Sequence, residues 1–126
     1  MAKEFATAIN CIDGRTQKPV AEYIQKSFKV DYVDMITEPG PNKILSEGQD
    51  TNTIELLKKK VEISVDKHNS QIIVIVAHYD CAGSLENEFV QKEHLRNAVK
   101  VIAAWKFPVK KILALWLDEH FRVEDV

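Results

Sequence analysis

Apolar positions along the chain follow two different periods, one typical of strands and one of helices. Four segments carry the short apolar runs of β-strands: Phe5–Cys11, residues 30–36, residues 71–77 and Lys111–Leu117. The third is rich in Ile and Val without alternation, as in a strand covered on both faces. The second alternates instead, which indicates a strand with one exposed side or edge.

Between the first three runs, apolar residues recur at helical spacing. We expect a first helix over residues 16–28, capped by Thr16 and carrying Pro19 in its first turn, where proline is tolerated. A second helix is expected after Asn52, which forms a capping-box pattern with Glu55. Each of these helices carries one apolar stripe that predicts burial against a sheet.

A third, longer helix is expected between the third and fourth strands. It would begin near Phe89, with Glu86 and Glu88 in a first turn that suits the helix dipole, and end before Pro108. Residues 38–42 hold two prolines and predict a loop. Residues 120–126 could add a short fifth strand or remain irregular.

Strands and helices therefore alternate as β-α-β-α-β-α-β. This order predicts a three-layer α/β/α architecture around a central, mainly parallel, four-stranded sheet with right-handed crossovers. Ligands of such sheets bind at the carboxyl ends of the strands. At 126 residues the chain fits one domain, residues 1–126.

Charge and hydropathy narrow the possible partners. Seventeen basic and nineteen acidic residues give a net charge of −2. This balance lacks the excess of basic residues that is typical of proteins that bind nucleic acid. The longest apolar run, residues 72–77, is too short to cross a bilayer, and no signal peptide is evident. We therefore expect a cytoplasmic protein without a membrane partner, whose two cysteines stay reduced.

Chemistry-bearing residues follow two of the predicted strands. Cys11 closes the first strand, and His78 and Cys81 follow the third. If those strands are neighbours, the three side chains meet at one edge of the sheet, as two thiolates and one imidazole suited to zinc. Asp13 and Arg15 flank the first cysteine, and a guanidinium keeps a neighbouring carboxylate ionised and oriented. Taken alone, Cys11 would be a buried apolar residue and His78 a strand-end residue.

The other three histidines, His68, His94 and His120, have no potential ligand at useful spacing and are expected to be surface residues or local caps. Asp80 could hydrogen-bond near the site or cap the local turn. Tyr79 could line a pocket, although packing against the following helix is the simpler expectation. No Cys-x-x-Cys, P-loop or dinucleotide-binding motif is present.

The stretches CIDGR (residues 11–15) and HYDC (residues 78–81) resemble the signature of the β-class carbonic anhydrases, Cys-x-Asp-x-Arg followed by His-x-x-Cys. The resemblance implies that Cys11, His78 and Cys81 bind one Zn²⁺ per chain. It implies that Asp13 and Arg15 form a catalytic dyad whose aspartate either orients a zinc-bound water or binds the zinc itself.

The implied activity is that of a lyase, carbonate dehydratase: hydration of CO2 to bicarbonate by a zinc-bound hydroxide. Family habit also implies a homodimer or higher homo-oligomer. The small pocket for CO2 would have apolar walls, expected among Ile12, Ile36, Tyr79 and Leu85.

Some features depart from the family pattern. Cys81-Ala82-Gly83 stands where many members have Cys-Gly, and residues 38–42 replace the loop that helps to line the CO2 pocket. The chain resembles a short member without the N-terminal helical arm. The alternative function is therefore a catalytically silent or divergent zinc-binding relative, which binds or senses a small anion or hydrolyses COS or CS2.

Overall fold

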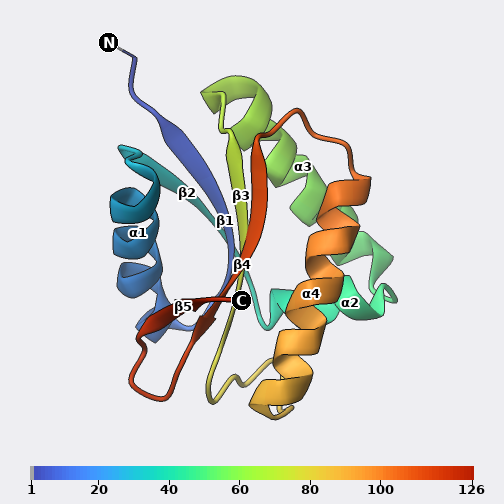
Figure 1. The fold of residues 1–126 in the computed structure, drawn as a ribbon. Coiled ribbons are helices and arrows are strands. Elements are labelled where there is room, and N and C mark those ends of the chain that lie inside the picture. Colours follow the sequence, from blue (N-terminus) through green and yellow to red (C-terminus); the bar gives the residue numbers. More distant parts are fainter. Residues whose placement is uncertain (1) are drawn as a thin grey trace.

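The computed structural model describes residues 2–126. Strands and helices follow one another as β1 (Phe5–Cys11), α1 (Gly14–Phe28), β2 (Tyr32–Glu38), α2 (Pro41–Glu47), α3 (Thr51–His68), β3 (Ile72–His78), α4 (Glu88–Ala104), β4 (Lys111–Leu117) and β5 (Val123–Asp125) (Figure 1).

The strands form one sheet in the order β2-β1-β3-β4-β5. The first four are parallel to their neighbours and β5 is antiparallel to β4. The predicted parallel sheet is thus confirmed, and the tail supplies the fifth strand. Cys11 pairs with Glu38, and His78 with Leu117, so the carboxyl ends of β1–β4 lie at the same edge.

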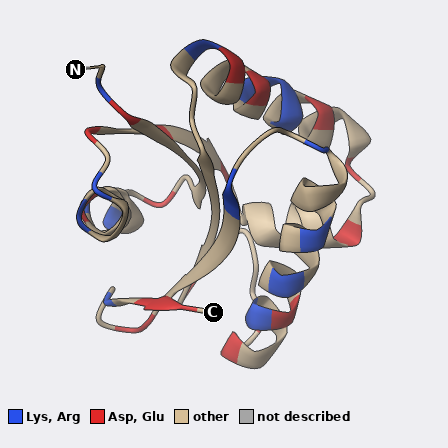
Figure 2. Ribbon diagram, turned by 45° about the horizontal axis from the view of Figure 1, so that its top comes forward, with Lys and Arg blue, Asp and Glu red and all other residues tan. Residues whose placement is uncertain are grey.

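Helices cover both faces of the sheet and make the three predicted layers. In β3, Ile73 and Ile75 belong to the core under α2, α3 and α4, whereas Val74 and Val76 belong to the core under α1. Both sets are fully buried, which explains why β3 lacks polar alternation. Figure 1 shows α1 alone on one side of the sheet, and Figure 2 shows the charged residues on the outer helices and loops.

Two predicted helix caps are wrong. Asp13, not Thr16, caps α1, because its carboxylate accepts a hydrogen bond from the backbone N–H of Arg15 at 2.9 Å. Asp50, not Asn52, caps α3 by accepting from the N–H of Thr53 at 3.1 Å. In both cases an earlier aspartate satisfies the free N–H groups and starts the helix sooner.

Two expectations for the segment after α1 are also corrected. The second strand is Tyr32–Glu38 rather than residues 30–36, because residues 29–31 reverse the chain: Lys29 has φ of 55°, and the N–H of Asp31 binds the Glu4 carbonyl. Residues 38–42 are not wholly loop, since α2 begins at Pro41. Gly40, with φ of 60°, precedes it in a conformation that favours glycine.

The third strand and the longest predicted helix need smaller adjustments. The strand runs one residue further than expected and includes His78 as its last residue. Asn87 caps α4 by accepting from the N–H of Val90 at 2.9 Å, so Glu86 lies before the helix and only Glu88 falls in its first turn. Among residues 2–126, each helix is too short or too polar to span a membrane.

Candidate metal centre

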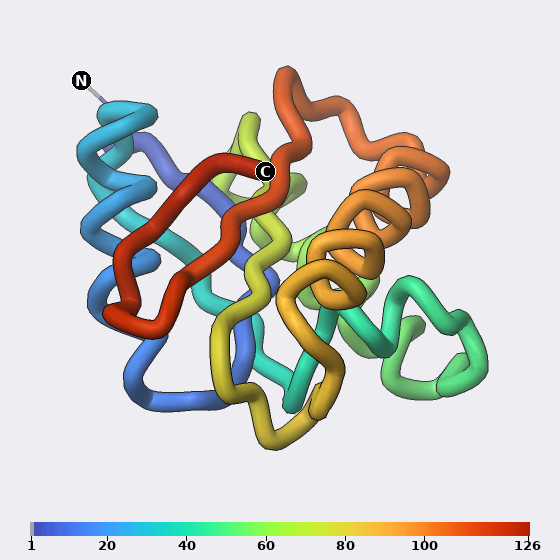
Figure 3. The backbone as a smooth tube through the Cα atoms, turned by 60° about the horizontal axis from the view of Figure 1, so that its bottom comes forward, coloured from blue at the N-terminus to red at the C-terminus, as the bar shows by residue number. Residues whose placement is uncertain are grey.

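Cys11, His78 and Cys81 meet at the carboxyl edge of the sheet. Cys11 ends β1, His78 ends the adjacent strand β3, and Cys81 lies in the turn that follows. The potential ligand atoms of all three lie within 4.8 Å of one another, and all three residues are buried. Figure 3 shows the loops after β1, β2 and β3 gathered at this end.

A backbone hydrogen bond fixes the orientation of the His78 ring. Nδ1 lies 2.7 Å from the carbonyl oxygen of Tyr79, which can only accept, so Nδ1 carries the proton. Nε2 is then the nitrogen with a free lone pair. It is buried and has no nitrogen or oxygen hydrogen-bond partner among the described residues. This is expected of an atom that coordinates a metal ion.

The two thiols share a buried environment without a disulfide. Their Sγ atoms are 3.7 Å apart. The pKa of Cys11 lies well below the ordinary thiol value, chiefly because Cys81 donates a hydrogen bond to its sulfur, and the same contact raises the pKa of Cys81. Burial lowers the pKa of His78, but its contacts with Cys11 and with the Tyr79 carbonyl outweigh that effect and raise it.

The arrangement fits a tetrahedral metal ion with soft ligands. With Zn–S bonds of about 2.3 Å, two thiolates on one zinc lie roughly 3.8 Å apart, close to the 3.7 Å between the two sulfurs. The unpaired Nε2 of His78 supplies the third donor. Sulfur and imidazole are donors that favour zinc over magnesium or calcium.

Backbone N–H groups near the two thiols also favour their ionised form. The backbone N–H groups of Gly40 and Asp13 lower the pKa of Cys11, and those of Gly83 and Ser84 act in the same direction on the pKa of Cys81. Such donors stabilise thiolates and orient them for a metal.

Close contact between two loops explains the glycines beside the site. A Cβ at Gly83 would lie 2.5 Å from the carbonyl carbon of Pro39, and one at Gly40 would lie 3.0 Å from that of Gly83. The glycine that follows Cys81-Ala82 is therefore required by the loop after β2. The sequence alone does not reveal this contact, because the two loops are more than forty residues apart.

Asp13 and Arg15 form an ion pair beside the three ligands. Asp13 Oδ2 lies 2.7 Å from an Arg15 guanidinium nitrogen and 3.9 Å from Nε2 of His78. Hydrogen bonds from Arg15 lower the pKa of Asp13 to about 2. The carboxylate is thus ionised near neutral pH and faces the potential metal position.

Arg15 is itself held from the opposite side. It contacts the Asp80 carbonyl at 3.2 Å and the Asp80 carboxylate at 3.4 Å. Its guanidinium also lies 4.8 Å from the ring centre of Phe121, a cation–π contact. Asp80 therefore contacts the dyad rather than acting only as a local cap.

Two residues near the site were missed by sequence reasoning. Phe121, in the turn between β4 and β5, packs under Arg15 and lies 6.2 Å from the His78 ring. Gln91 of α4 donates to the backbone carbonyl of His78 at 3.1 Å. Neither carries a sequence signal, because each depends on a contact across the fold.

The predicted apolar walls do not enclose a pocket within one chain. Ile36 is buried in the core, whereas Ile12 is 62%, Tyr79 50% and Leu85 91% exposed. Tyr79 is half exposed, and its packing against the following helix stays a prediction. The other three predicted wall residues are exposed, and each lies within four positions of a potential ligand in the sequence. We call Ile12, Tyr79 and Leu85 the exposed apolar rim.

Known structures resemble this fold over nearly the whole chain. One of two tetrameric β-carbonic anhydrases from Sordaria macrospora superposes with a TM-score of 0.60 at 14% identity, covering 100% of this chain and 81% of the other. The β-carbonic anhydrase CafA of Aspergillus fumigatus gives 0.61 at 12% identity, with 99% and 76% covered. A carbonic anhydrase from Glaciozyma antarctica gives 0.57 at 13%, with 94% and 80% covered.

These identities establish likeness of fold alone. None of the curated proteins compared with the sequence matches it significantly. A family model described as "Putative carbonic anhydrase" matches residues 1–126. With the whole sequence matched and a β-carbonic-anhydrase fold, the chain belongs to the carbonic anhydrase family.

Proposed function

We propose that residues 1–126 form one zinc-binding domain that hydrates CO2 to bicarbonate. One observation carries the proposal: Nε2 of His78, buried and unpaired, faces two buried sulfurs and lies 3.9 Å from a carboxylate oxygen of Asp13. Cys11, His78 and Cys81 would hold the zinc. A purely structural site would not need the ionised Asp13–Arg15 pair beside it.

When bound, zinc supplies a hydroxide nucleophile near neutral pH by lowering the pKa of water. The residues of the chain determine how the reaction is positioned. His78 keeps its proton on Nδ1 through the Tyr79 carbonyl, which leaves Nε2 free to bind metal. Two thiolates offset the charge of the cation, and the backbone N–H groups around them favour the ionised form.

Asp13 would orient the reacting water rather than remove its proton. Its pKa of about 2 makes it a weak base near neutral pH, but its ionised oxygen accepts hydrogen bonds well. Arg15 fixes the carboxylate through three contacts of 2.7–3.2 Å. As the water oxygen bonds to the carbon of CO2, one C–O π bond opens to give bicarbonate, and one proton leaves to solvent or buffer.

A second chain would complete the substrate pocket in this proposal. Ile12, Tyr79 and Leu85 are exposed around the site, and apolar side chains that gather at a functional edge favour burial against a partner. The related Sordaria macrospora enzymes are tetrameric. We therefore infer a homodimer or higher homo-oligomer, and a cytoplasmic location where the thiols remain reduced.

The same exposed rim favours a second candidate, a zinc-binding relative that does not hydrate CO2 but binds a small anion or hydrolyses COS or CS2. The test combines elemental analysis with stopped-flow CO2 hydration on the zinc-loaded protein. The first candidate predicts near-stoichiometric zinc and hydration above the buffer rate. Zinc-loaded protein with no hydration above buffer would reject CO2 as the substrate, and COS and CS2 assays would then test the alternative.

A further inference from the structure

A second cavity lies at the opposite edge of the sheet from the metal centre. It has a volume of about 640 Å³ and is lined by the start of β1, the end of α1, the turn after α3 and the segment before β4. Figure 1 shows these segments beside the N-terminal end. The volume lies within the range of small-molecule sites. Its apolar lining consists of Ala2, Phe5, Phe28, Val30 and Ile72.

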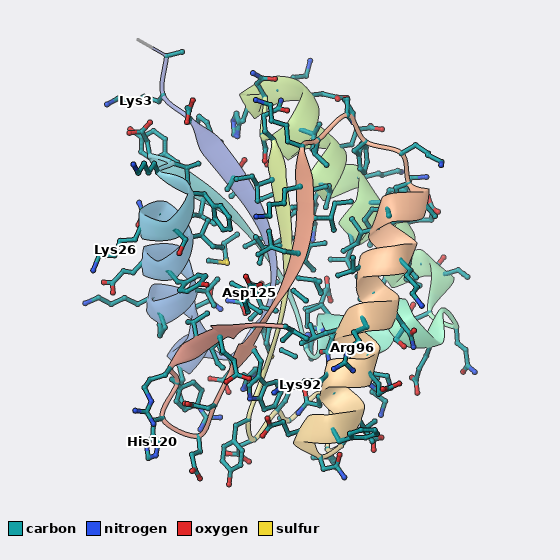
Figure 4. The ribbon with its side chains drawn as sticks, viewed as in Figure 1. Lys3, Lys26, Lys92, Arg96, His120 and Asp125 are labelled. Atoms are coloured by element: carbon teal, nitrogen blue, oxygen red, sulfur yellow. The ribbon has the colours of Figure 1, made fainter. Side chains whose placement is uncertain are left out.

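Positive charge surrounds this cavity. Lys3, Lys67, Lys110 and Lys111 line it, and none forms an ion pair with a residue in the described part of the chain. Glu4 is the one carboxylate in the lining. In Figure 4, Lys3 is labelled at this end of the molecule. Four lysines against one glutamate, in a chain of net charge −2, make a local excess of positive charge that attracts anions.

His68 is held in a fixed orientation at the same cavity. Its ring stacks on Phe5 with 4.1 Å between ring centres, and its Nδ1 lies 2.7 Å from Oδ2 of Asp34. Ser64 donates to the same carboxylate oxygen at 2.6 Å. Nε2 makes no hydrogen bond with the described residues. His68 thus lies on the surface, as expected, and these contacts also hold its imidazole in place.

Backbone hydrogen bonds fix the walls of the cavity. The Glu4 carbonyl accepts from the N–H of Asp31 at 2.9 Å, which ties the start of β1 to the turn after α1. The Gln71 carbonyl accepts from the N–H of Lys110 at 2.9 Å, which ties the turn after α3 to the segment before β4. These hydrogen bonds hold the walls of the cavity in place, which reduces the entropy cost of binding.

We propose that this cavity binds an organic phosphate, a phosphate monoester carried on an apolar or aromatic body. A phosphate monoester carries a charge of about −1.5 to −2 near neutral pH. It therefore interacts with several lysines more strongly than a ligand with a single carboxylate would. The apolar body would lie against lining residues such as Val30 and Ile72, because His68 stacks on Phe5 and the Lys111 ammonium lies 5.4 Å from the Phe28 ring centre. The site is separate from the metal centre and goes beyond the proposed hydration of CO2.

The test uses the zinc-loaded protein labelled with ¹⁵N and phenyl phosphate as the probe, followed by amide chemical-shift changes. Phenyl phosphate is expected to change the chemical shifts of amides in the lining segments. It should bind several-fold more tightly than inorganic phosphate, which lacks the apolar body, or phenol, which lacks the phosphate group. The double variant Lys67→Gln/Lys111→Gln should weaken binding about tenfold. The matched control Lys59→Gln/Lys100→Gln removes two lysines that do not line the cavity and should leave the affinity unchanged.

Three results would overturn the proposal. They are an absence of localised shifts at millimolar phenyl phosphate, equal affinity for inorganic phosphate, and equal weakening in the control variant. The last two would indicate attraction of anions to the general surface instead of a built site. Far-ultraviolet circular dichroism of each variant checks that a lost response does not come from unfolding.

Discussion

Oδ2 of Asp13 lies 3.9 Å from Nε2 of His78, and the same carboxylate is bound by Arg15 at 2.7 Å. One side chain thus joins the start of α1 to the potential metal ligands. It also caps α1 through the Arg15 N–H, so the helix start, the ion pair and the site are fixed by one residue.

The first prediction concerns metal content. Purified protein should contain about one zinc per chain, and Cys81→Ser should lose most of it, because a hydroxyl replaces a thiolate ligand. Elemental analysis after dialysis measures both. Ser84→Ala serves as the control, since it alters a buried neighbour of the same turn that is not a ligand. Full zinc occupancy in Cys81→Ser would show that the thiolate is not needed.

The second prediction concerns the dyad. Asp13→Asn should retain zinc and the cap of α1, since asparagine caps helices well, but should lower CO2 hydration about 100-fold by removing the charged oxygen that orients water. Stopped-flow hydration at matched zinc content measures the effect. Asp80→Asn, which changes a weaker 3.4 Å contact with Arg15, should have a much smaller effect. Equal rates for Asp13→Asn and the parent would exclude the orienting role.

The sequence predicts the ligand cluster because parallel neighbours bring the ends of β1 and β3 to one edge. Positions along the chain cannot reveal Phe121 beneath Arg15, or the contact between the Gly40 and Gly83 loops, since both depend on how distant turns meet. Helix α2 was not predicted, because the two prolines of residues 38–42 indicate a loop. In the structure Gly40 is the N-cap and Pro41 is the first residue of the helix, a position where proline is tolerated. Local pattern therefore specifies elements and strand ends, while long-range loop packing shapes the surroundings of the site.

The third prediction tests the loop contact. Gly83→Ala should lower the free energy of unfolding by roughly 1–3 kcal/mol, because its Cβ would overlap the Pro39 backbone, which cannot move aside like a flexible side chain. Urea denaturation measures the change. Gly14→Ala is the matched control: a Cβ there meets nothing within 4 Å, so stability should stay level or rise slightly. Similar losses in both variants would argue against the overlap.

The fourth prediction concerns pH and the turn that carries Phe121. Backbone N–H groups of Arg122 and His120 donate to Asp118 and lower its pKa. A lowered folded-state pKa stabilises the fold above the unfolded value of about 3.9, and this contribution is lost as pH falls through the folded value. Asp118→Asn keeps an acceptor oxygen but does not titrate.

From about pH 5 to pH 2, the urea midpoint of the parent should therefore fall further than that of Asp118→Asn. Comparison of the two proteins cancels acid effects on the metal centre, which both share. Parallel curves over this range would show that Asp118 contributes no pH-dependent stability.

The last prediction concerns the exposed apolar rim at the metal centre. Sedimentation at micromolar concentration should give a homodimer or larger species rather than a 14.4 kDa monomer. Leu85 is 91% exposed, and burial of a leucine stabilises by about 1.5–3 kcal/mol. In a two-fold interface each substitution occurs twice, so Leu85→Asp should weaken association by a factor of about 100 to 10,000.

Leu56→Asp is the control for this substitution, because Leu56 is also exposed, at 53%, but lies on α3, which carries none of the potential ligands. Dissociation by Leu85→Asp with zinc retained, and no change in Leu56→Asp, would place the interface at the site. The opposite pattern would place the interface on α3. A monomeric parent protein would reject the proposal that a second chain completes the substrate pocket. CO2 hydration should fall with dissociation of Leu85→Asp, because Ile12 and Tyr79 would then remain open to solvent instead of enclosing the substrate.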